Sequence, residues 1–165
     1  MTTRGVIFDL DGTLVSLPID YSDLYAKFRQ IIGGKSVEPL TKTVADLNDA
    51  LRKKVFKTWT RAEFEILPRM TVVKEGIKLY EQYSEVPKAL ITMQGKDTTK
   101  RILHTLTLTF WTVITREDSL DRTAQIALAL EKLRLKPENV LVIGDRETDK
   151  MAAEKNGCKF RRVKT

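Results

Sequence analysis

Two carboxylates at the end of an apolar run are the first residues in the chain that could do chemistry. Residues 6–8 are apolar, Asp9 and Asp11 follow two positions apart, and Gly12 permits a sharp turn. In an open α/β sheet the ligand crevice lies outside the carboxyl ends of the strands, so Asp9 would face it. The alternative is an acidic turn without chemistry, since Asp-Gly is common in turns.

A second acidic position follows a later apolar run. Residues 140–143 are apolar, Gly144 and Asp145 come next, and Asp149 stands where a helix should begin. Helix capping would explain Asp149 by itself, but it would not explain Asp145 at the tip of a central strand. Two strand ends that carry carboxylates form an oxygen-rich site, which suits a hard cation such as Mg²⁺.

The elements that must position these acids alternate along most of the chain. Apolar runs predict strands at residues 6–8, 89–91, 110–114, 140–143 and 158–163. Apolar residues at helical spacing predict helices over residues 70–80 and 126–133. This order predicts an α/β fold, a Rossmann-like three-layer parallel sheet with helices on both faces. We expect the first strand at its centre, beside the strands at 89–91 and 140–143.

The segment between the first two predicted strands shows no strand pattern. Apolar spacing predicts a helix over residues 24–31, ended by Gly33-Gly34, and a longer helix over residues 44–59. We therefore expect a small helical cap at residues 18–67, inserted after the first strand. Residues 1–17 and 68–165 would form the core domain, and the cap would move relative to it.

These motifs, in this order, resemble the haloacid dehalogenase superfamily in its phosphatase branch, and phosphoglycolate phosphatases in particular. The first motif of that family, Asp-x-Asp-Gly-Thr, is matched by residues 9–13. Its second motif, a Ser or Thr that ends the second core strand, is matched by Thr92. Its fourth motif, Gly-Asp followed by another acid, is matched by Gly144, Asp145 and Asp149. The resemblance extends over nearly the whole chain.

The third motif departs from the family pattern. The family normally has a Lys before the helix that leads to the fourth motif, and this chain has none there. Arg122 is the nearest cationic candidate, and Arg116 is the second. An arginine could neutralise a phosphate and an aspartate, although as a planar fork rather than as a compact point charge.

The resemblance implies a phosphatase that hydrolyses a small phosphorylated metabolite, with phosphoglycolate as the substrate that the family suggests. Asp9 would attack phosphorus and form an aspartyl-phosphate, which divides one difficult hydrolysis into two easier steps. Asp11 would act as general acid and then as general base. Thr92 and Arg122 would bind the phosphoryl group.

The resemblance also implies Mg²⁺ as the cofactor. Asp9 and Asp145 would hold the metal by their side chains, and Asp11 by its backbone carbonyl. Asp149 would support the water shell of the metal or orient a ligand.

Other functions share parts of this pattern. A phosphomutase of the same fold has all these motifs. Arg122 in place of Lys would suit a noncatalytic module of this fold. The net charge of +7 would suit a module that binds the ends of nucleic acids. A dehalogenase is disfavoured, because the resemblance there normally lacks the acid at Asp11.

Composition narrows the class of protein. The 165 residues are 42% hydrophobic and carry no apolar run near the ~20 residues of a membrane span. The basic residues are spread along the chain, which favours a solvated surface, so we expect no nucleic-acid partner. Cys158 is the single cysteine, and residues 1–4 leave no room for a signal peptide, so we expect a cytoplasmic protein. The sequence leaves the oligomeric state open.

Overall fold

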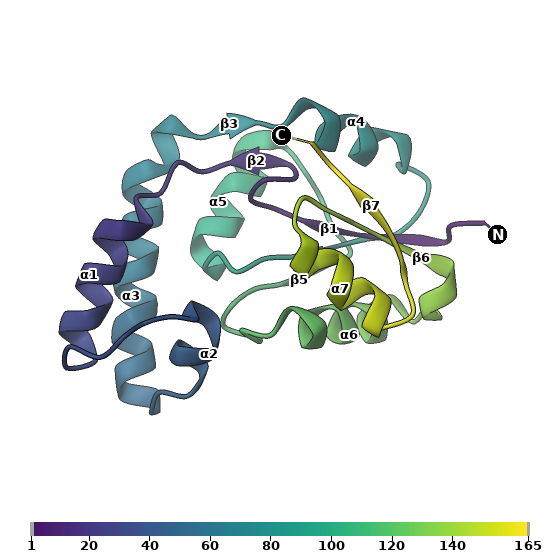
Figure 1. Ribbon diagram of the computed structural model, residues 1–165. Helices are drawn as coiled ribbons and strands as arrows, with labels where there is room; N and C mark the ends of the chain where they lie inside the picture. Colours follow the sequence, from purple (N-terminus) through teal and green to yellow (C-terminus); the bar gives the residue numbers. More distant parts are fainter. Residues whose placement is uncertain (1, 165) are drawn as a thin grey trace.

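A five-stranded parallel sheet forms the centre of the protein in a computed structural model that describes residues 2–164 (Figure 1). In chain order its strands are β1 (Gly5–Asp9), β4 (Lys88–Ile91), β5 (Thr112–Ile114), β6 (Val140–Gly144) and β7 (Lys159–Arg162). The spatial order is β5-β4-β1-β6-β7, and each neighbouring pair is parallel. The prediction of β1 as the central strand, between β4 and β6, is confirmed.

Helices cover both faces of this sheet (Figure 1). One layer holds α4 (Lys74–Gln82) and α5 (Lys96–Leu106), and the other holds α6 (Arg122–Leu133) and α7 (Glu147–Lys155). Successive strand residues point to opposite faces, so Ile7 packs with the α6 and α7 side chains, while Val6 and Phe8 pack with α4 and α5. The predicted three-layer α/β fold is confirmed. Within residues 2–164, no helix has both the length and the apolar character that crossing a membrane requires.

Three further helices form a helical insertion within residues 18–67, at one end of the molecule (Figure 1). They are α1 (Tyr21–Ile31), α2 (Leu40–Ala45) and α3 (Asp49–Ile66). The insertion has its own apolar cluster, in which the rings of Phe28 and Trp59 lie 5.7 Å apart. Helix α1 ends just before Gly33 and Gly34, both of which have positive φ. The prediction that these two glycines end the helix is therefore confirmed.

The single helix predicted over residues 44–59 is wrong, because the chain breaks there into α2 and α3. Val44 belongs to α2, and α3 begins after Asn48. The side chain of Asn48 accepts a hydrogen bond from Leu51 N at 2.9 Å and so caps α3. The apolar spacing runs on across the break, and periodicity therefore did not reveal it.

A short antiparallel ribbon was not predicted. It pairs β2 (Val15–Ser16) with β3 (Thr71–Val72), at the two ends of the helical insertion. The helix predicted from residue 70 in fact begins at Lys74, after a short 3₁₀ turn η1 (Leu67–Arg69) and β3. Strands of two residues are too short to leave a period-two pattern. A second 3₁₀ turn, η2 (Pro137–Asn139), precedes β6.

Cys158, directly before β7, offers a test of how well this end of the core is buried. It is 6% exposed, and burial raises the pKa of its thiol to about 11. Because the thiolate is the reactive form, we expect iodoacetamide to label the folded protein about 100-fold more slowly than an exposed cysteine at mildly alkaline pH. Intact-mass measurements with and without urea will follow the reaction. Equal labelling in both conditions would contradict the burial of Cys158 between α7 and β7.

Candidate active site

The turn after β1 places Gly12 against Asp145, another of the predicted acids. Asp9 ends β1, and Gly12, at φ 87°, reverses the chain so that its N–H donates to Val15 O at 2.7 Å. A Cβ at Gly12 would lie 2.2 Å from Oδ2 of Asp145. Glycine is therefore required at this position for its backbone conformation and for the space that the Asp145 carboxylate occupies.

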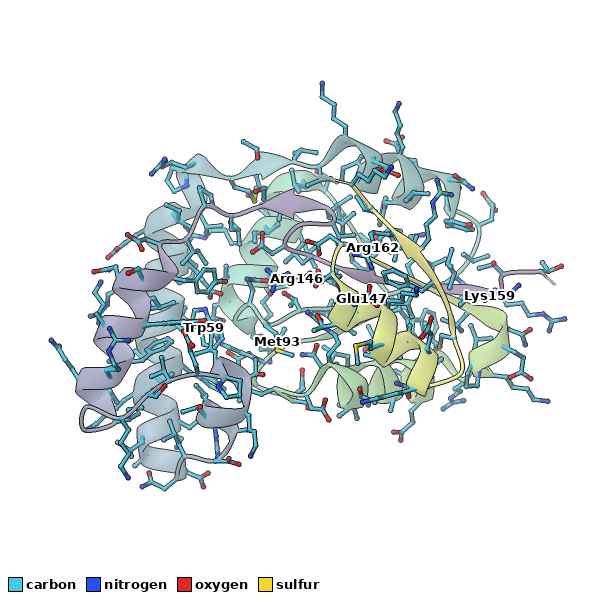
Figure 2. All side chains as sticks on the ribbon, in the orientation of Figure 1. Trp59, Met93, Arg146, Glu147, Lys159 and Arg162 are labelled. Atoms are coloured by element: carbon cyan, nitrogen blue, oxygen red, sulfur yellow. The ribbon has the colours of Figure 1, made fainter. Side chains whose placement is uncertain are left out.

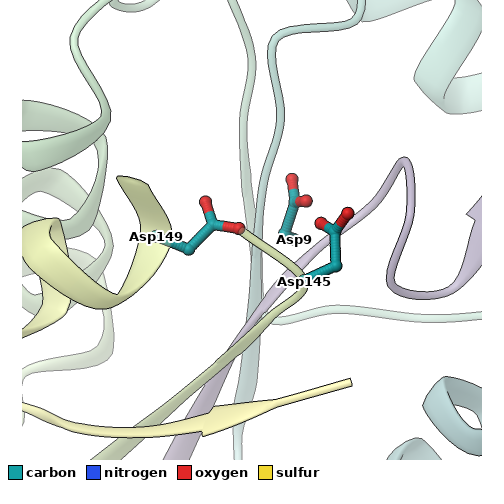
Figure 3. Close-up of side chains that lie close together, drawn as sticks. All are labelled: Asp9, Asp145 and Asp149. Carbon is teal, nitrogen blue, oxygen red and sulfur yellow. The ribbon is translucent and has the colours of Figure 1, made fainter. Parts of the chain in front are cut away.

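Three carboxylates meet at this edge of the sheet (Figure 3). Asp9 comes from β1, Asp145 directly follows β6, and Asp149 lies in the first turn of α7. One oxygen from each lies within 4.8 Å of the others, and Asp9 and Asp149 are buried. Thr13 Oγ1 lies 3.5 Å from Asp9 Oδ2 and 3.4 Å from Asp145 Oδ1. Carboxylates this close repel one another unless positive charge lies beside them.

Arg122 supplies part of that positive charge. It is the first residue of α6; its Nη2 lies 3.3 Å from Asp9 Oδ1 and its Nε 3.1 Å from Asp149 Oδ1. Gln125, one turn further along α6, accepts a hydrogen bond from Arg122 Nη1 at 2.9 Å. The sequence left Arg122 and Arg116 open, and the structure places Arg122 beside Asp9. Arg116 is paired with Glu63 instead.

The pKa of Asp9 is raised although Arg122 lies beside it. Burial raises the pKa of Asp9 to about 8, Arg122 acts against this rise, and Asp149 and Asp145 add to it. Without a further positive charge, Asp9 would therefore hold a proton at neutral pH. A divalent cation beside the three carboxylates would favour the ionised form.

The donor atoms fit such a cation. All three side chains offer carboxylate oxygens, which are the ligands that Mg²⁺ prefers. Oδ1 of Asp149 is buried and, among residues 2–164, accepts no well-aligned hydrogen bond, although Arg122 Nε lies 3.1 Å from it. Its Oδ2 accepts a hydrogen bond from Arg146 N at 3.2 Å, which fixes the side chain at the start of α7.

Asp11 lies outside this group of carboxylates. Its Oδ1 accepts a hydrogen bond from Leu17 N at 3.0 Å. Burial raises the pKa of Asp11, while the Leu17 N–H partly opposes the rise. The two acids of the first motif thus have different partners, although they are two residues apart.

Thr92 lies at the same edge of the sheet. The β1–β4 register pairs Asp9 with Ile91, and Thr92 is the next residue. The Thr92 hydroxyl donates to Gln94 Oε1 at 2.5 Å, and the Thr92 carbonyl accepts from Gln125 Nε2 at 2.9 Å. Gln125 therefore connects Thr92 with Arg122.

Thr13, Gln94 and Gln125 were not predicted as site residues. The spacing of Gln125, three positions after Arg122 on a helix, was the one local signal that could have indicated it.

A hollow lies between the helical insertion and the ends of the strands. It consists of two cavities of about 390 and 380 Å³, which share Thr41, Met93 and Arg146 in their walls. Arg122 lines the first cavity, and the second is also lined by Tyr21, Tyr25, Leu40 and Trp59. Figure 2 shows Trp59 on the insertion, with Met93 and Arg146 toward the core. Arg146, which the sequence did not single out, thus lines both cavities, and its Nε lies 3.9 Å from Asp145 Oδ2.

Known proteins resemble this chain in sequence. A family model for haloacid dehalogenase-like hydrolases matches residues 6–163. A phosphoglycolate phosphatase of Aquifex aeolicus is 26% identical over 94% of this chain and 82% of its own length.

Solved structures also resemble the chain. A hydrolase from Pseudomonas syringae has a TM-score of 0.69 at 19% identity, over 97% of this chain and 82% of its own. CbbY from Rhodobacter sphaeroides in complex with phosphate has a TM-score of 0.65 at 14% identity, over 96% of this chain and 85% of its own. At these identities the likeness concerns the fold alone.

Replacing Arg122 tests the balance of charge in the site. In Arg122→Gln, Asp9 and Asp149 lose the cation that pairs with them. We therefore expect the free energy of unfolding in EDTA to fall by about 1–3 kcal/mol, below the range for fully buried pairs because Arg122 is 17% exposed. Urea unfolding measures the change. Arg161→Gln, at an exposed position of β7, is the control. An equal effect of both substitutions would show that Arg122 does not hold the cluster together.

Proposed function

Because the chain belongs to the haloacid dehalogenase-like hydrolase family, we propose that it is a Mg²⁺-dependent phosphatase acting on a small phosphorylated metabolite through an aspartyl-phosphate. The observation that carries this proposal is the meeting of Asp9, Asp145 and Asp149 with Arg122 at the end of β1. The Aquifex relative named for phosphoglycolate supports that substrate as the first to test.

Asp9 is the proposed nucleophile. An Oδ of Asp9 attacks phosphorus, an Asp9 O–P bond forms, and the bond between phosphorus and the substrate oxygen breaks. Water then attacks the aspartyl-phosphate, releases inorganic phosphate and restores the Asp9 carboxylate. Arg122, 3.3 Å from Asp9 Oδ1, is close enough to meet the negative charge of the phosphoryl oxygens.

Asp11 is the proposed general acid and base. In the first step it donates a proton to the substrate oxygen as that oxygen leaves. In the second step it removes a proton from the attacking water. The raised pKa of Asp11 favours the protonated form that the first step requires, and the hydrogen bond from Leu17 N holds the carboxyl in place.

Thr92 and Arg146 are the proposed substrate contacts. The Thr92 hydroxyl donates to Gln94, and a rotation about its Cα–Cβ bond would redirect it to a phosphoryl oxygen. Arg146 lines both cavities and would attract an anionic group on the leaving part of the substrate. Burial, with a smaller contribution from the Asp11 carboxylate, raises the pKa of Tyr21 to about 12, so Tyr21 remains a neutral donor in the second cavity.

Asp9, Asp145, Asp149 and the backbone carbonyl of Asp11 would hold Mg²⁺. The metal, when bound, supplies positive charge that keeps Asp9 ionised and offsets the charge of the phosphoryl group. Residues 18–67 would form a cap on a core domain of residues 1–17 and 68–165, excluding bulk water from the site. The cavities, at about 390 and 380 Å³, suit a small metabolite.

Phosphate release from a panel of phosphorylated metabolites, with Mg²⁺ or with EDTA, tests this proposal. We expect release with Mg²⁺ and loss of at least about 100-fold in EDTA, because removal of the metal leaves the buried carboxylates unbalanced. Asp9→Asn should abolish turnover. Asp97→Asn, at an exposed position of α5, should leave it unchanged.

The same assay separates hydrolysis from phosphomutase activity, because only hydrolysis releases inorganic phosphate. If Asp9→Asn turned over substrate at the wild-type rate, and mass measurement excluded deamidation of Asn to Asp, Asp9 would not be the nucleophile.

A further inference from the structure

A fully buried ion pair joins the helical insertion to the core. Arg116 follows β5 on the core, and Glu63 lies in α3 of the insertion. Arg116 Nη1 and Glu63 Oε2 are 2.8 Å apart, and both side chains are 0% exposed. A buried charge is strongly unfavourable without its partner, so each of these residues depends on the other.

Residues on one face of α3 contact the guanidinium of Arg116. Arg116 Nη2 donates to Thr60 Oγ1 at 2.7 Å and to the Phe56 carbonyl at 3.4 Å, and the group lies 4.4 Å from the ring centre of Trp59. Phe56, Trp59, Thr60 and Glu63 are spaced i, i+3, i+4 and i+7, which places them on one stripe of the helix. The insertion is thus attached to the core through a side chain that the core supplies.

The same pair holds the loop that follows β4. Arg116 Nη1 donates to the Met93 carbonyl at 3.1 Å, and Gly95 N donates to Glu63 Oε1 at 3.2 Å. Thr98, in the first turn of α5, also donates to Glu63 Oε1, at 2.8 Å. A Cβ at Gly95 would lie 2.8 Å from Arg116 Nη2, so the loop and the guanidinium are in close contact. Residues 93 and 95 of this loop are therefore fixed by the ion pair.

We propose that Arg116 and Glu63 are positioning residues, which lock the insertion onto the core and fix the loop of residues 92–95 that carries Thr92. The proposal rests on the proposed function in one respect, the role of Thr92 at the phosphoryl group. Any movement of the insertion relative to the core would therefore have to break this pair. A swing of the insertion would separate the two charges, remove the stacking on Trp59 and release the loop.

Glu63→Gln tests the lock with the smallest change, because glutamine has a similar shape and can still accept hydrogen bonds but leaves Arg116 without a counter-charge. Glu65→Gln, the same substitution at an exposed position of α3, is the matched control. Hydrogen exchange followed by mass spectrometry should show about 10-fold faster exchange in the second half of α3 and in residues 92–98 for Glu63→Gln alone.

Kinetics distinguish positioning from a merely structural role. At a temperature well below unfolding, we expect kcat of Glu63→Gln to fall by about 10- to 100-fold with a smaller change in KM, because the Thr92 loop is displaced. If Glu63→Gln does not fold, Arg116→Lys serves instead, since it retains the charge but cannot reach Glu63, Thr60 and Met93 together. We expect the same direction of change in both measurements.

Two results would overturn the proposal. Wild-type exchange as fast as that of the variants would show that the insertion opens freely. A variant that loses only thermal stability, with unchanged kcat, would show that the pair does not position Thr92. Absence of phosphatase activity in the wild type would instead remove the proposed function and the role of Thr92, while hydrogen exchange would still decide the lock.

Discussion

Repulsion among Asp9, Asp145 and Asp149 is the constraint on which the arrangement of the site depends. Their oxygens lie within 4.8 Å of one another because β1 and β6 are adjacent parallel strands whose carboxyl ends meet. Glycine occupies two positions beside these carboxylates, because a Cβ at Gly12 or Gly144 would lie 2.2 or 2.6 Å from a carboxylate oxygen. The fold tolerates this concentration of negative charge only with positive charge beside it. Arg122 provides one such charge, and the pKa of Asp9 is still raised, first by burial and then by Asp149 and Asp145.

Two arginines from one segment of the chain have different roles at this site. Arg122, at the start of α6, meets the carboxylates and is linked through Gln125 to the carbonyl of Thr92. Arg116 holds α3 and the loop after Thr92 by its pair with Glu63. Thr92 is thus connected to an arginine on either side. In this account the catalytic edge and the helical insertion are parts of one hydrogen-bonded network.

The sequence predicted the central features, because they depend on local patterns. Continuous apolar runs predicted the strands, and the acids after residues 6–8 and 140–143 predicted that these two strands meet. The break at Asn48 and the ribbon of β2 and β3 were missed, since two-residue strands leave no periodicity and the apolar spacing continues across the break. Glu63 and Arg116 are 53 positions apart, so no local pattern could pair them. Arg122 and Arg116 are distinguished by their partners, which only the fold determines.

The central claim is that Asp9 forms a covalent phosphoryl intermediate, which Asp11 then helps to hydrolyse. The most direct measurement is the mass of enzyme quenched in acid during turnover of an aryl phosphate with Mg²⁺, followed by peptide mapping. An aryl leaving group needs little protonation, so Asp11→Asn should still be phosphorylated but should lose phosphate about 10²–10⁴-fold more slowly. We predict one added phosphoryl group on the peptide that contains Asp9, which accumulates in Asp11→Asn and is absent from Asp9→Asn. Rapid turnover by Asp11→Asn, or a phosphoryl group on any other residue, would contradict it.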